Sequence, residues 1–505
     1  MTLEVWDDSI GSDHLWTNGN VGEAIPDVMT PATWSVVAPF MARAMPGTEV
    51  AGRHAFGRVA GRFYLDLSML VALAGTAGMP RRRLLRTIAP IFGELPVGLE
   101  VPPVVLPRLR TLRGLVVGTV EAARRARRLR GGVADTLAAV PGRCAAVRRE
   151  IEAADRPALA GLWAGRVAPL FDETSGLMDV ARREGTALVR VPARLARLAG
   201  PEDAALLTTA PDMASLGPVL GLAKLRAGTL DVDEFAQRYG HRGPHEFELS
   251  IPRPTEEPHW RARQQELATT GPDPAELMVR QAAARTAARD RLLRAHPRRA
   301  RRLDRDLAAW ARAAELREHV RSECVRVFGV IRVWVLRAGA LLDIGDDAFL
   351  CSVTELRAAL TGAPLPDLAV RRATYEHYRA LPAPPPLVRD GRDAAAADPG
   401  TGPLRGTGAS GGVAIGTVRV LVDAHEGLEP GEVLVAATTN VGWTPLFPLA
   451  AAVVTDVGAT LSHAAIVARE LGVPAVVGCG TATQRLRTGM RVRVDGTAGT
   501  VTVLG

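Results

Sequence analysis

The sequence feature that most constrains the fold is a long amphipathic stretch over residues 300–342. Its apolar side chains recur in alternating steps of three and four, a spacing that keeps them on one face of an α-helix: Leu316, Val320, Cys324, Val327, Ile331, Val335, Ala338 and Leu342. Gly345 follows as a stop signal. Shorter amphipathic stretches precede it at roughly 57–77, 108–130, 144–154, 156–172, 202–226 and 273–295. The chain from about residue 55 to 345 is therefore predicted to be mainly α-helical.

A change of composition divides the rest of the chain. Residues 381–407 are rich in proline, alanine and glycine and lack apolar periodicity, which is typical of an exposed linker. Short apolar segments follow, at 413–422, 432–437, 451–455, 475–477, 491–494 and 500–504. At 505 residues the chain is long enough for two to four domains. We predict a multidomain fold with a large, mainly α-helical domain at 1–380, a linker at 381–407 and a compact α/β domain at 408–505.

Charge and cysteine usage exclude several classes of function. The net charge of +8 is carried by arginine, because Lys224 is the only lysine, and no P-loop motif is present. Clusters of arginine without interleaved aromatics indicate solvated helix faces rather than a nucleic-acid site. The four cysteines are scattered, so no metal site is predicted. No run of about 20 apolar residues and no signal-peptide pattern occurs, which favours a cytoplasmic protein with no membrane partner.

The second half of the α/β domain carries a reactive histidine. An apolar strand at 451–455 leads through a small-residue turn to His463, and the apolar spacing after it predicts a helix that ends near Gly472. Thr460 or Ser462 is suited to cap that helix. The positive end of a helix disfavours the imidazolium form, and its free N–H groups suit a phosphoryl group. His463 is therefore predicted to accept phosphate.

The segment 457–474, and its neighbours at 438–447, 474–478 and 494–501, closely resemble the phosphohistidine domain of the phosphoenolpyruvate-utilising enzymes. In that family a swivelling domain carries phosphate on the histidine that matches His463, and the resemblance implies a supporting role for Thr460, Ser462 and Arg469 in the same loop. Ala459 departs from the pattern, since the family usually has a second glycine there. The layout resembles rifampin phosphotransferase and the phenylphosphate synthase subunit.

A second chemical stretch lies at 238–253, where two glycines and a proline predict a tight loop between helices. It resembles a Gly-x-Arg-x-x-x-Glu segment of the substrate domain in rifampin-phosphotransferase-like members. The resemblance matches Arg242 and Glu246, and then Glu248 and Arg253. Arg242 is suited to clamp a transferring phosphoryl group, and His241 or Glu246 to take a proton from an acceptor hydroxyl. The alternative is an internal salt-bridge network that folds the loop.

The N-terminal stretch 15–35 is dense in turn formers and amide side chains, and it resembles the first segment of the same substrate domain. Asn18, Asn20, Glu23 and Trp34 are the candidates to line a substrate pocket there by stacking and hydrogen bonding. A buried connector is an equally good interpretation.

These observations predict a phosphotransferase of the phosphoenolpyruvate-utilising family without its own nucleotide site. We expect a separate ATP-grasp-type protein, using ATP and Mg²⁺, to load His463, and a small molecule held in the helical domain to receive the phosphoryl group on a hydroxyl. No tightly bound cofactor or metal is expected in the chain itself. The alternatives are a non-catalytic phosphocarrier and a dehydratase that phosphorylates a hydroxyl in order to eliminate it.

Overall fold

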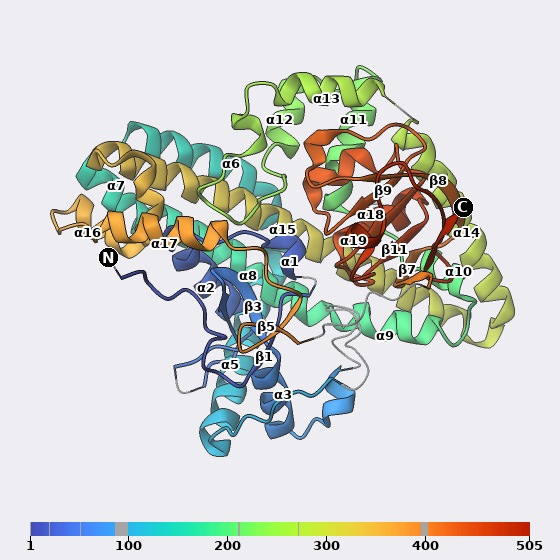
Figure 1. Cartoon of the computed structure of the whole chain (residues 1–505), viewed down its shortest axis with the longest axis horizontal. Helices are drawn as coiled ribbons and strands as arrows, with labels where there is room; N and C mark the ends of the chain where they lie inside the picture. The colour runs from blue at the N-terminus through green and yellow to red at the C-terminus, as the bar shows by residue number, and fades with distance from the viewer. Residues whose placement is uncertain are drawn as a thin grey trace.

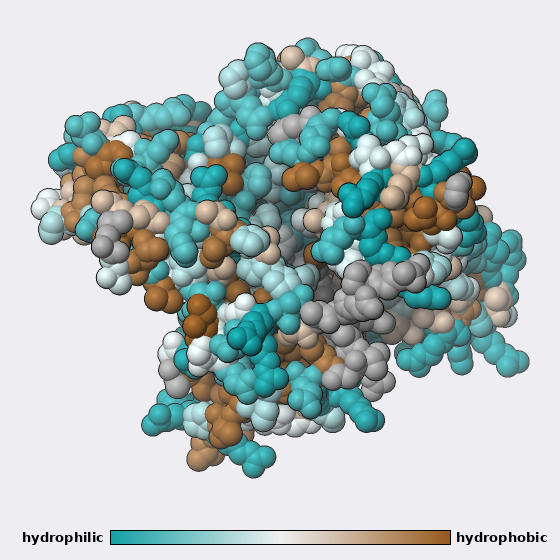
Figure 2. Space-filling model, viewed as in Figure 1, coloured by the Kyte–Doolittle hydropathy of each residue, from teal (hydrophilic) through white to brown (hydrophobic). Residues whose placement is uncertain are grey.

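The computed structural model describes residues 2–19, 21–50, 52–85, 99–210, 213–270, 272–394 and 402–504. A small N-terminal sheet, a large helical body and a C-terminal α/β domain make up these residues, as Figure 1 shows. Hydrophilic residues cover most of the face drawn in Figure 2, with apolar residues in small groups between them. No helix among the described residues combines the length and the apolar character needed to cross a membrane.

Helix α15 (Ala300–Leu342) forms the axis of the helical body and has the bounds that the sequence predicts. Asp343 ends it in the left-handed conformation, with φ 59°, two residues before the predicted stop at Gly345. Its C-terminal half packs against α6 and α8 in the main helical core, around the fully buried Trp334. The other helices before the linker are α1 (Val21–Ala24), α2 (Pro31–Ala44), α3 (Leu67–Thr76), α5 (Arg108–Leu129), α6 (Val133–Ala153), α7 (Arg156–Leu162), α8 (Ala168–Glu184), α9 (Thr186–Leu195), α10 (Pro201–Leu206), α11 (Gly217–Arg226), α12 (Val232–Tyr239), α13 (Trp260–Thr269), α14 (Pro274–Ala295), α16 (Val353–Leu360) and α17 (Leu368–Ala380).

The N-terminal sheet was not predicted and corrects the helix expected at 57–77. Ala60 and Gly61 both have positive φ, at 46° and 75°, and make a two-residue hairpin turn. Only the second part of the predicted helix is helical, as α3. The five strands lie in the order β2-β3-β1-β4-β5, and all pairs are antiparallel: β1 (Leu15–Thr17), β2 (Phe56–Val59), β3 (Arg62–Asp66), β4 (Leu387–Arg389) and β5 (Arg392–Asp393).

Strands β4 and β5 belong to the segment predicted as an exposed linker. Leu387 and Val388 are buried there, and β4 pairs directly with β1. The proline-rich part just before them is also anchored, because the Tyr64 hydroxyl donates to the carbonyl oxygens of Pro384 and Pro385. The linker prediction is therefore wrong for 384–393, and the link between the domains that the sequence places at 381–407 is shorter than expected.

The C-terminal domain is one mixed eight-stranded sheet in the order β6-β13-β12-β8-β9-β10-β11-β7, with parallel pairing from β8 to β11. Its two first strands in the chain were not predicted, and the other six lie close to their predicted positions. The elements are β6 (Leu404–Arg405), β7 (Thr407–Ser410), β8 (Val413–Val420), β9 (Val433–Ala436), β10 (Ala452–Thr455), α18 (His463–Leu471), β11 (Ala475–Val477), α19 (Ala482–Arg485), β12 (Arg491–Asp495) and β13 (Thr500–Leu504).

Alternate residues of the central strands face two different cores. Val433 and Val435 of β9 face a core internal to the domain. Leu434 and Ala436 face a second core, which α18 shares with α9, α10, α14 and the N-terminal half of α15. The C-terminal domain is thus docked on the helical body through a continuous apolar interface. Figure 1 shows this domain, in red, beside α10, α11 and α14.

Candidate functional site

His463 is the first residue of α18, as the sequence predicts. Between β10 and α18 the chain turns at Gly458, whose φ is 153° and where an added Cβ would lie 2.9 Å from the Cβ of Val477. Ser462 is the N-cap, and its side chain accepts a hydrogen bond from the backbone N–H of Ala465 at 3.3 Å. Of the two predicted capping residues, Ser462 is therefore the one that caps the helix.

Arg469, one turn from the end of α18, holds the loop that precedes it. Its Nε donates to the carbonyl oxygen of Ala409 at 3.0 Å, and its Nη2 donates to that of Thr460 at 3.1 Å. The guanidinium is buried and ties α18 to β7 and to the loop before the helix. Thr460 thus lies in the loop before His463, and Arg469 holds that loop from α18.

The His463 ring points into the interface with the helical body and is only 5% exposed. Its Nε2 lies 3.0 Å from the Oγ1 of Thr444, which belongs to the 3₁₀ turn η8 (Val441–Leu446). The backbone N–H of His463 donates to the Oε2 of Glu23 at 2.8 Å. Glu23 comes from α1, 440 residues earlier in the chain, so this contact joins the N-terminal segment to the C-terminal domain.

A network of charged side chains from the helical body surrounds the histidine. Glu246 accepts from the Nε of Arg242 at 2.5 Å and from the Nη2 of Arg321 at 3.2 Å. Glu318, one turn before Arg321 on α15, accepts from Arg317 at 3.0 Å. The Nη1 and Nη2 atoms of Arg242 are buried and have no hydrogen-bond partner within the described part of the chain. Two adjacent N–H groups of a buried guanidinium form a fork that fits a phosphoryl group.

The surroundings shift the pKa values of the two groups that meet at the interface. Burial, together with the charge of Arg321, lowers the pKa of His463 to about 3, so the imidazole is neutral. Burial raises the pKa of Glu23 to about 8, although the hydrogen bond from the His463 backbone opposes the shift. Burial also acts to raise the pKa of Glu318, but Arg317 and Arg321 outweigh it and lower that pKa to about 2. The site therefore combines a neutral histidine, one carboxyl group that titrates near neutrality and one that stays ionised.

The predicted residues of the 238–253 loop separate into two groups. Arg242 and Glu246 lie in the network around His463, and both carboxylate oxygens of Glu246 are taken by hydrogen bonds from arginines. His241 faces away from it, with Nε2 2.9 Å from the Oγ of Ser322. Arg253 donates through Nη1 to the carbonyl oxygens of His245 and Glu246. The loop is thus partly the internal network that was the alternative interpretation.

The carboxylate of Glu248 is held by hydrogen bonds inside the helical body, which indicates a structural role. Its carboxylate accepts hydrogen bonds from the hydroxyls of Thr30, Thr33 and Ser250 at 2.8–3.0 Å, and from the backbone N–H groups of Thr30 and Ser250. Burial raises its pKa. It therefore joins the 238–253 loop to the start of α2, and the structure does not place it among the residues around His463.

Of the candidates in the N-terminal stretch, one lies at His463, and the others that the structure describes contact the N-terminal sheet. Glu23 contacts His463 directly, as described above. Trp34 packs between Phe56 and Phe63 of the N-terminal sheet, and Arg58 lies over its ring. The Nδ2 of Asn18 donates to the Tyr64 hydroxyl at 3.1 Å. Asn20 lies outside the described residues. The connector interpretation fits Trp34 and Asn18, whereas Glu23 is part of the site.

Sequence reasoning missed Arg321, Glu318 and Thr444. Glu318 and Arg321 lie on α15 beside its apolar stripe, and two opposite charges next to a buried face are the signal that was available. Thr444 lies inside a segment that the family resemblance covers, but nothing in its spacing relates it to a histidine 19 residues away.

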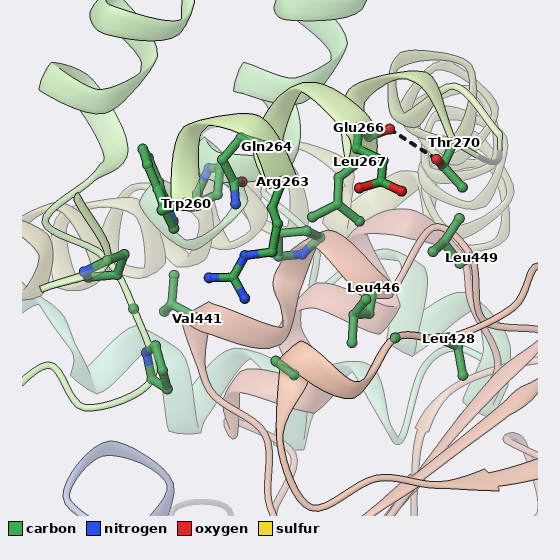
Figure 3. Close-up of a pocket in the computed structure, with 18 of the residues that line it drawn as sticks. Trp260, Arg263, Gln264, Glu266, Leu267, Thr270, Leu428, Val441, Leu446 and Leu449 are labelled. Atoms are coloured by element: carbon green, nitrogen blue, oxygen red, sulfur yellow. Dashed lines mark hydrogen bonds between the residues drawn. The ribbon is translucent and has the colours of Figure 1, made fainter. Parts of the chain in front are cut away.

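A cavity of about 390 Å³ lies beside the network, between helices α11–α13 and the C-terminal domain. Figure 3 shows Trp260 and Arg263 on one side of it and Val441 and Leu446 on the other. Arg242 also lines it, and η8 contributes residues on both sides of Thr444. The cavity therefore joins Arg242 to the C-terminal domain.

Comparison with known proteins agrees with this geometry. Residues 428–499 match the family model described as PEP-utilising enzyme, mobile domain. A rifampicin phosphotransferase of Streptomyces sviceus is 38% identical over 175 residues, which is 33% of this chain and 20% of that protein. The prodigiosin synthesizing transferase PigC of Serratia marcescens is 34% identical over 295 residues, or 54% of this chain and 33% of its own length. The phosphoenolpyruvate synthase of Aeropyrum pernix is 52% identical over 101 residues, or 19% and 12%.

The chain thus spans between 12% and 33% of the length of these three relatives. All three alignments are with proteins named as transferases or synthases, and the mobile-domain match includes His463 and its loop. Residues 428–499 are thus similar to the mobile domain of the PEP-utilising enzymes, and a larger part of the chain is similar to rifampicin phosphotransferase and PigC.

Proposed function

We propose that this chain transfers a phosphoryl group from His463 to a hydroxyl of a small molecule bound between its two domains. The observation that carries the proposal is the meeting of His463 with a buried arginine whose two Nη atoms have no partner in the described residues. Although Glu246 pairs with its Nε, leaving the two buried Nη groups without acceptors is costly, and a transferring phosphoryl group would satisfy them. The relatives named rifampicin phosphotransferase support the same class of reaction.

In the proposed step the P–N bond to the imidazole breaks, and its electron pair returns to the ring nitrogen. A new P–O bond forms to the acceptor hydroxyl, whose proton passes to Glu23. The ionised form of Glu23 can take this proton, and because burial raises its pKa to about 8 it is a stronger base than an ordinary carboxylate. The lowered pKa of His463 favours release of a neutral imidazole. Arg242 and Arg321 supply positive charge to the phosphoryl oxygens.

The interdomain cavity is the proposed acceptor site. Its volume of about 390 Å³ lies in the range of small-molecule pockets. Phe235, Tyr239 and Trp260 give it an aromatic wall, and Glu257 and Arg263 add polar groups. This mixture suits an acceptor with a ring system and a few polar substituents, and the shared wall at Arg242 would bring its hydroxyl toward His463.

Loading of His463 requires the C-terminal domain to leave this position, because the docked imidazole is buried and its Nε2 is occupied by Thr444. We propose that a separate ATP-grasp-type protein, with ATP and Mg²⁺, phosphorylates the released domain. The docked arrangement then corresponds to the unphosphorylated state that follows delivery.

Chemical loading tests the proposal without the donor. Potassium phosphoramidate phosphorylates imidazoles directly, so the full chain is treated with it and the labelled residue is found by mass spectrometry. Phenol, benzyl alcohol and glycerol are then offered as acceptors, and phosphate esters are followed by ³¹P NMR. We expect label on His463 in the wild-type protein, and in the Arg242→Gln variant label without ester formation.

Arg166→Gln is the matched control, since that arginine pairs with an exposed carboxylate of Glu150 far from the site in the fold. It should behave as the wild type. A His463→Gln protein that labels and transfers as well as the wild type would end the proposal. Stable label with no transfer to any acceptor, in the wild type and Arg242→Gln alike, would favour the phosphocarrier instead.

A further inference from the structure

A second cavity, of about 580 Å³, lies on the other side of the loop that carries Arg242. Its walls come from α6, the end of α12, the middle of α15 and the 3₁₀ turn η4 (Pro254–Glu256). Consecutive residues of the loop face different cavities, because Arg242 lines the interdomain cavity and His241 lines this one. The second cavity is therefore separate from the proposed acceptor site.

The side chains that line this cavity carry a net positive charge. Arg148 of α6, Arg253 of the loop and Arg326 of α15 line it, together with a single carboxylate, that of Glu256. Glu256 is already neutralised from outside the cavity by Arg332, which donates to it at 2.8 Å. Arg326 is paired with Glu323 at 2.8 Å, which leaves Arg148 and Arg253 as the arginines whose charge dominates the cavity.

Two of the side chains that line the cavity have buried polar atoms without partners. The Nε and Nη2 atoms of Arg253 and the Nδ1 atom of His241 are buried and have no hydrogen-bond partner in the residues that the structure describes. The Nδ1 atom of His241 is a donor in the tautomer in which its Nε2 accepts from the Ser322 hydroxyl. Leaving such donors unsatisfied costs free energy, and a ligand that accepts hydrogen bonds would recover it. A multi-oxygen anion matches the fork of the Arg253 guanidinium.

The backbone of α15 makes room for a third donor. Gly329 lies under the Arg148 guanidinium, and a Cβ added there would be 2.7 Å from its Nη2. Any larger residue at 329 would displace the guanidinium, so the glycine lets Arg148 lie across α15 at the cavity wall.

We propose that this cavity binds a small oxyanion, a carboxylate or a phosphate, on Arg148, Arg253 and His241. The volume leaves space for a ligand of several non-hydrogen atoms around the charged group.

The bound anion would also fix the loop. Arg253 donates through Nη1 to the carbonyl oxygens of His245 and Glu246 at 3.0 and 2.9 Å. Its remaining N–H groups have no partner in the described residues, so a ligand bound to them would immobilise the guanidinium that holds Glu246, and with it Arg242. The effect on phosphoryl transfer rests on the proposed function, whereas the binding itself does not.

Isothermal titration calorimetry of the full chain tests the site, with inorganic phosphate and malonate as probes that distinguish the two sources of oxyanion. We expect Arg148→Gln to weaken binding of the preferred probe by at least about tenfold, the value of a hydrogen bond to a charged group. Gly329→Ala keeps every charge and suits a helix, yet should weaken binding by displacing Arg148. Arg143→Gln, on α6 but paired with Glu173, is the matched control and should bind as the wild type.

Arg242→Gln separates this site from the one at His463, since it should leave the binding unchanged. The proposal is overturned if neither probe binds, or if binding is lost in Arg242→Gln and kept in Arg148→Gln. It is equally overturned if Arg143→Gln weakens binding as much as Arg148→Gln, which would indicate attraction by the general positive charge. Loss of phosphoryl transfer in the wild type would refute the proposed function and leave these binding results standing.

Discussion

Glu23 should control how often the C-terminal domain leaves the helical body. In the docked state burial brings the pKa of this carboxyl from 4.5 to about 8. In the released state we expect its ordinary value. The docked state therefore binds the proton more tightly, so docking is strongest below pH 4.5 and weakens as the pH rises toward 8. At pH 7 this ionisation costs the docked state about 3 kcal/mol, because a tenfold difference in proton affinity is worth about 1.4 kcal/mol.

Replacing Glu23 with glutamine removes that cost. The amide oxygen still accepts the hydrogen bond from the His463 N–H, but the side chain does not ionise. The released fraction at pH 7 should therefore fall about a hundredfold. Phosphoramidate labels only the released histidine, so the initial rate of His463 labelling reports that fraction, and the ratio of wild-type to Glu23→Gln rates cancels the titration of the imidazole itself.

We expect this ratio to be near one at pH 4.5 and to rise to about a hundred at pH 7. Glu276→Gln is the control, since Glu276 is exposed on α14, and its ratio should stay near one throughout. A ratio for Glu23→Gln that does not change with pH, or a variant that labels faster than the wild type at pH 7, would refute the reasoning.

Three further substitutions test other parts of the structure. Arg321→Gln should leave chemical labelling of His463 intact but slow delivery of the phosphoryl group about a hundredfold, measured as ester formation from the labelled protein. Ser462→Ala removes the N-cap of α18 and should destabilise that helix by about 1 kcal/mol, seen as faster hydrogen exchange of its first amides. Glu248→Ala leaves the hydroxyls of Thr30 and Thr33 without their acceptor and should destabilise the helical body by about 2–4 kcal/mol in urea denaturation; unchanged stability would contradict the structural role.

Elements with strong periodicity could be predicted, and those defined by a short turn could not. Helix α15 has its predicted bounds because its apolar stripe is long enough to fix the helical period. The β2–β3 hairpin was missed because Ala60, a residue that rarely adopts positive φ, takes the first turn position. Strand β4 was missed because it follows a proline-rich run and pairs with β1, far away in the sequence.

The same distinction applies to the site. His463 and Arg242 stand in segments whose local residue types indicate their chemistry, and the structure brings both to one interface. The assignment of a proton acceptor could not be made locally, since Glu246 is held by two arginines, whereas the pKa of Glu23 is raised by burial in the folded molecule. Arg321 enters the site through domain packing, which no short segment encodes.

The apolar interface under α18 makes receiving and giving the phosphoryl group mutually exclusive in time. When the C-terminal domain is released, the apolar face of α18 that packs near α14 and α15 is exposed to water. Because exposure of apolar surface costs free energy, the released domain should dock again rapidly. A donor protein that binds the released domain long enough to phosphorylate His463 must therefore cover this face of α18 with an apolar surface of its own. The phosphorylated histidine would then be protected from water both on the donor and on the helical body, which limits its hydrolysis between the two.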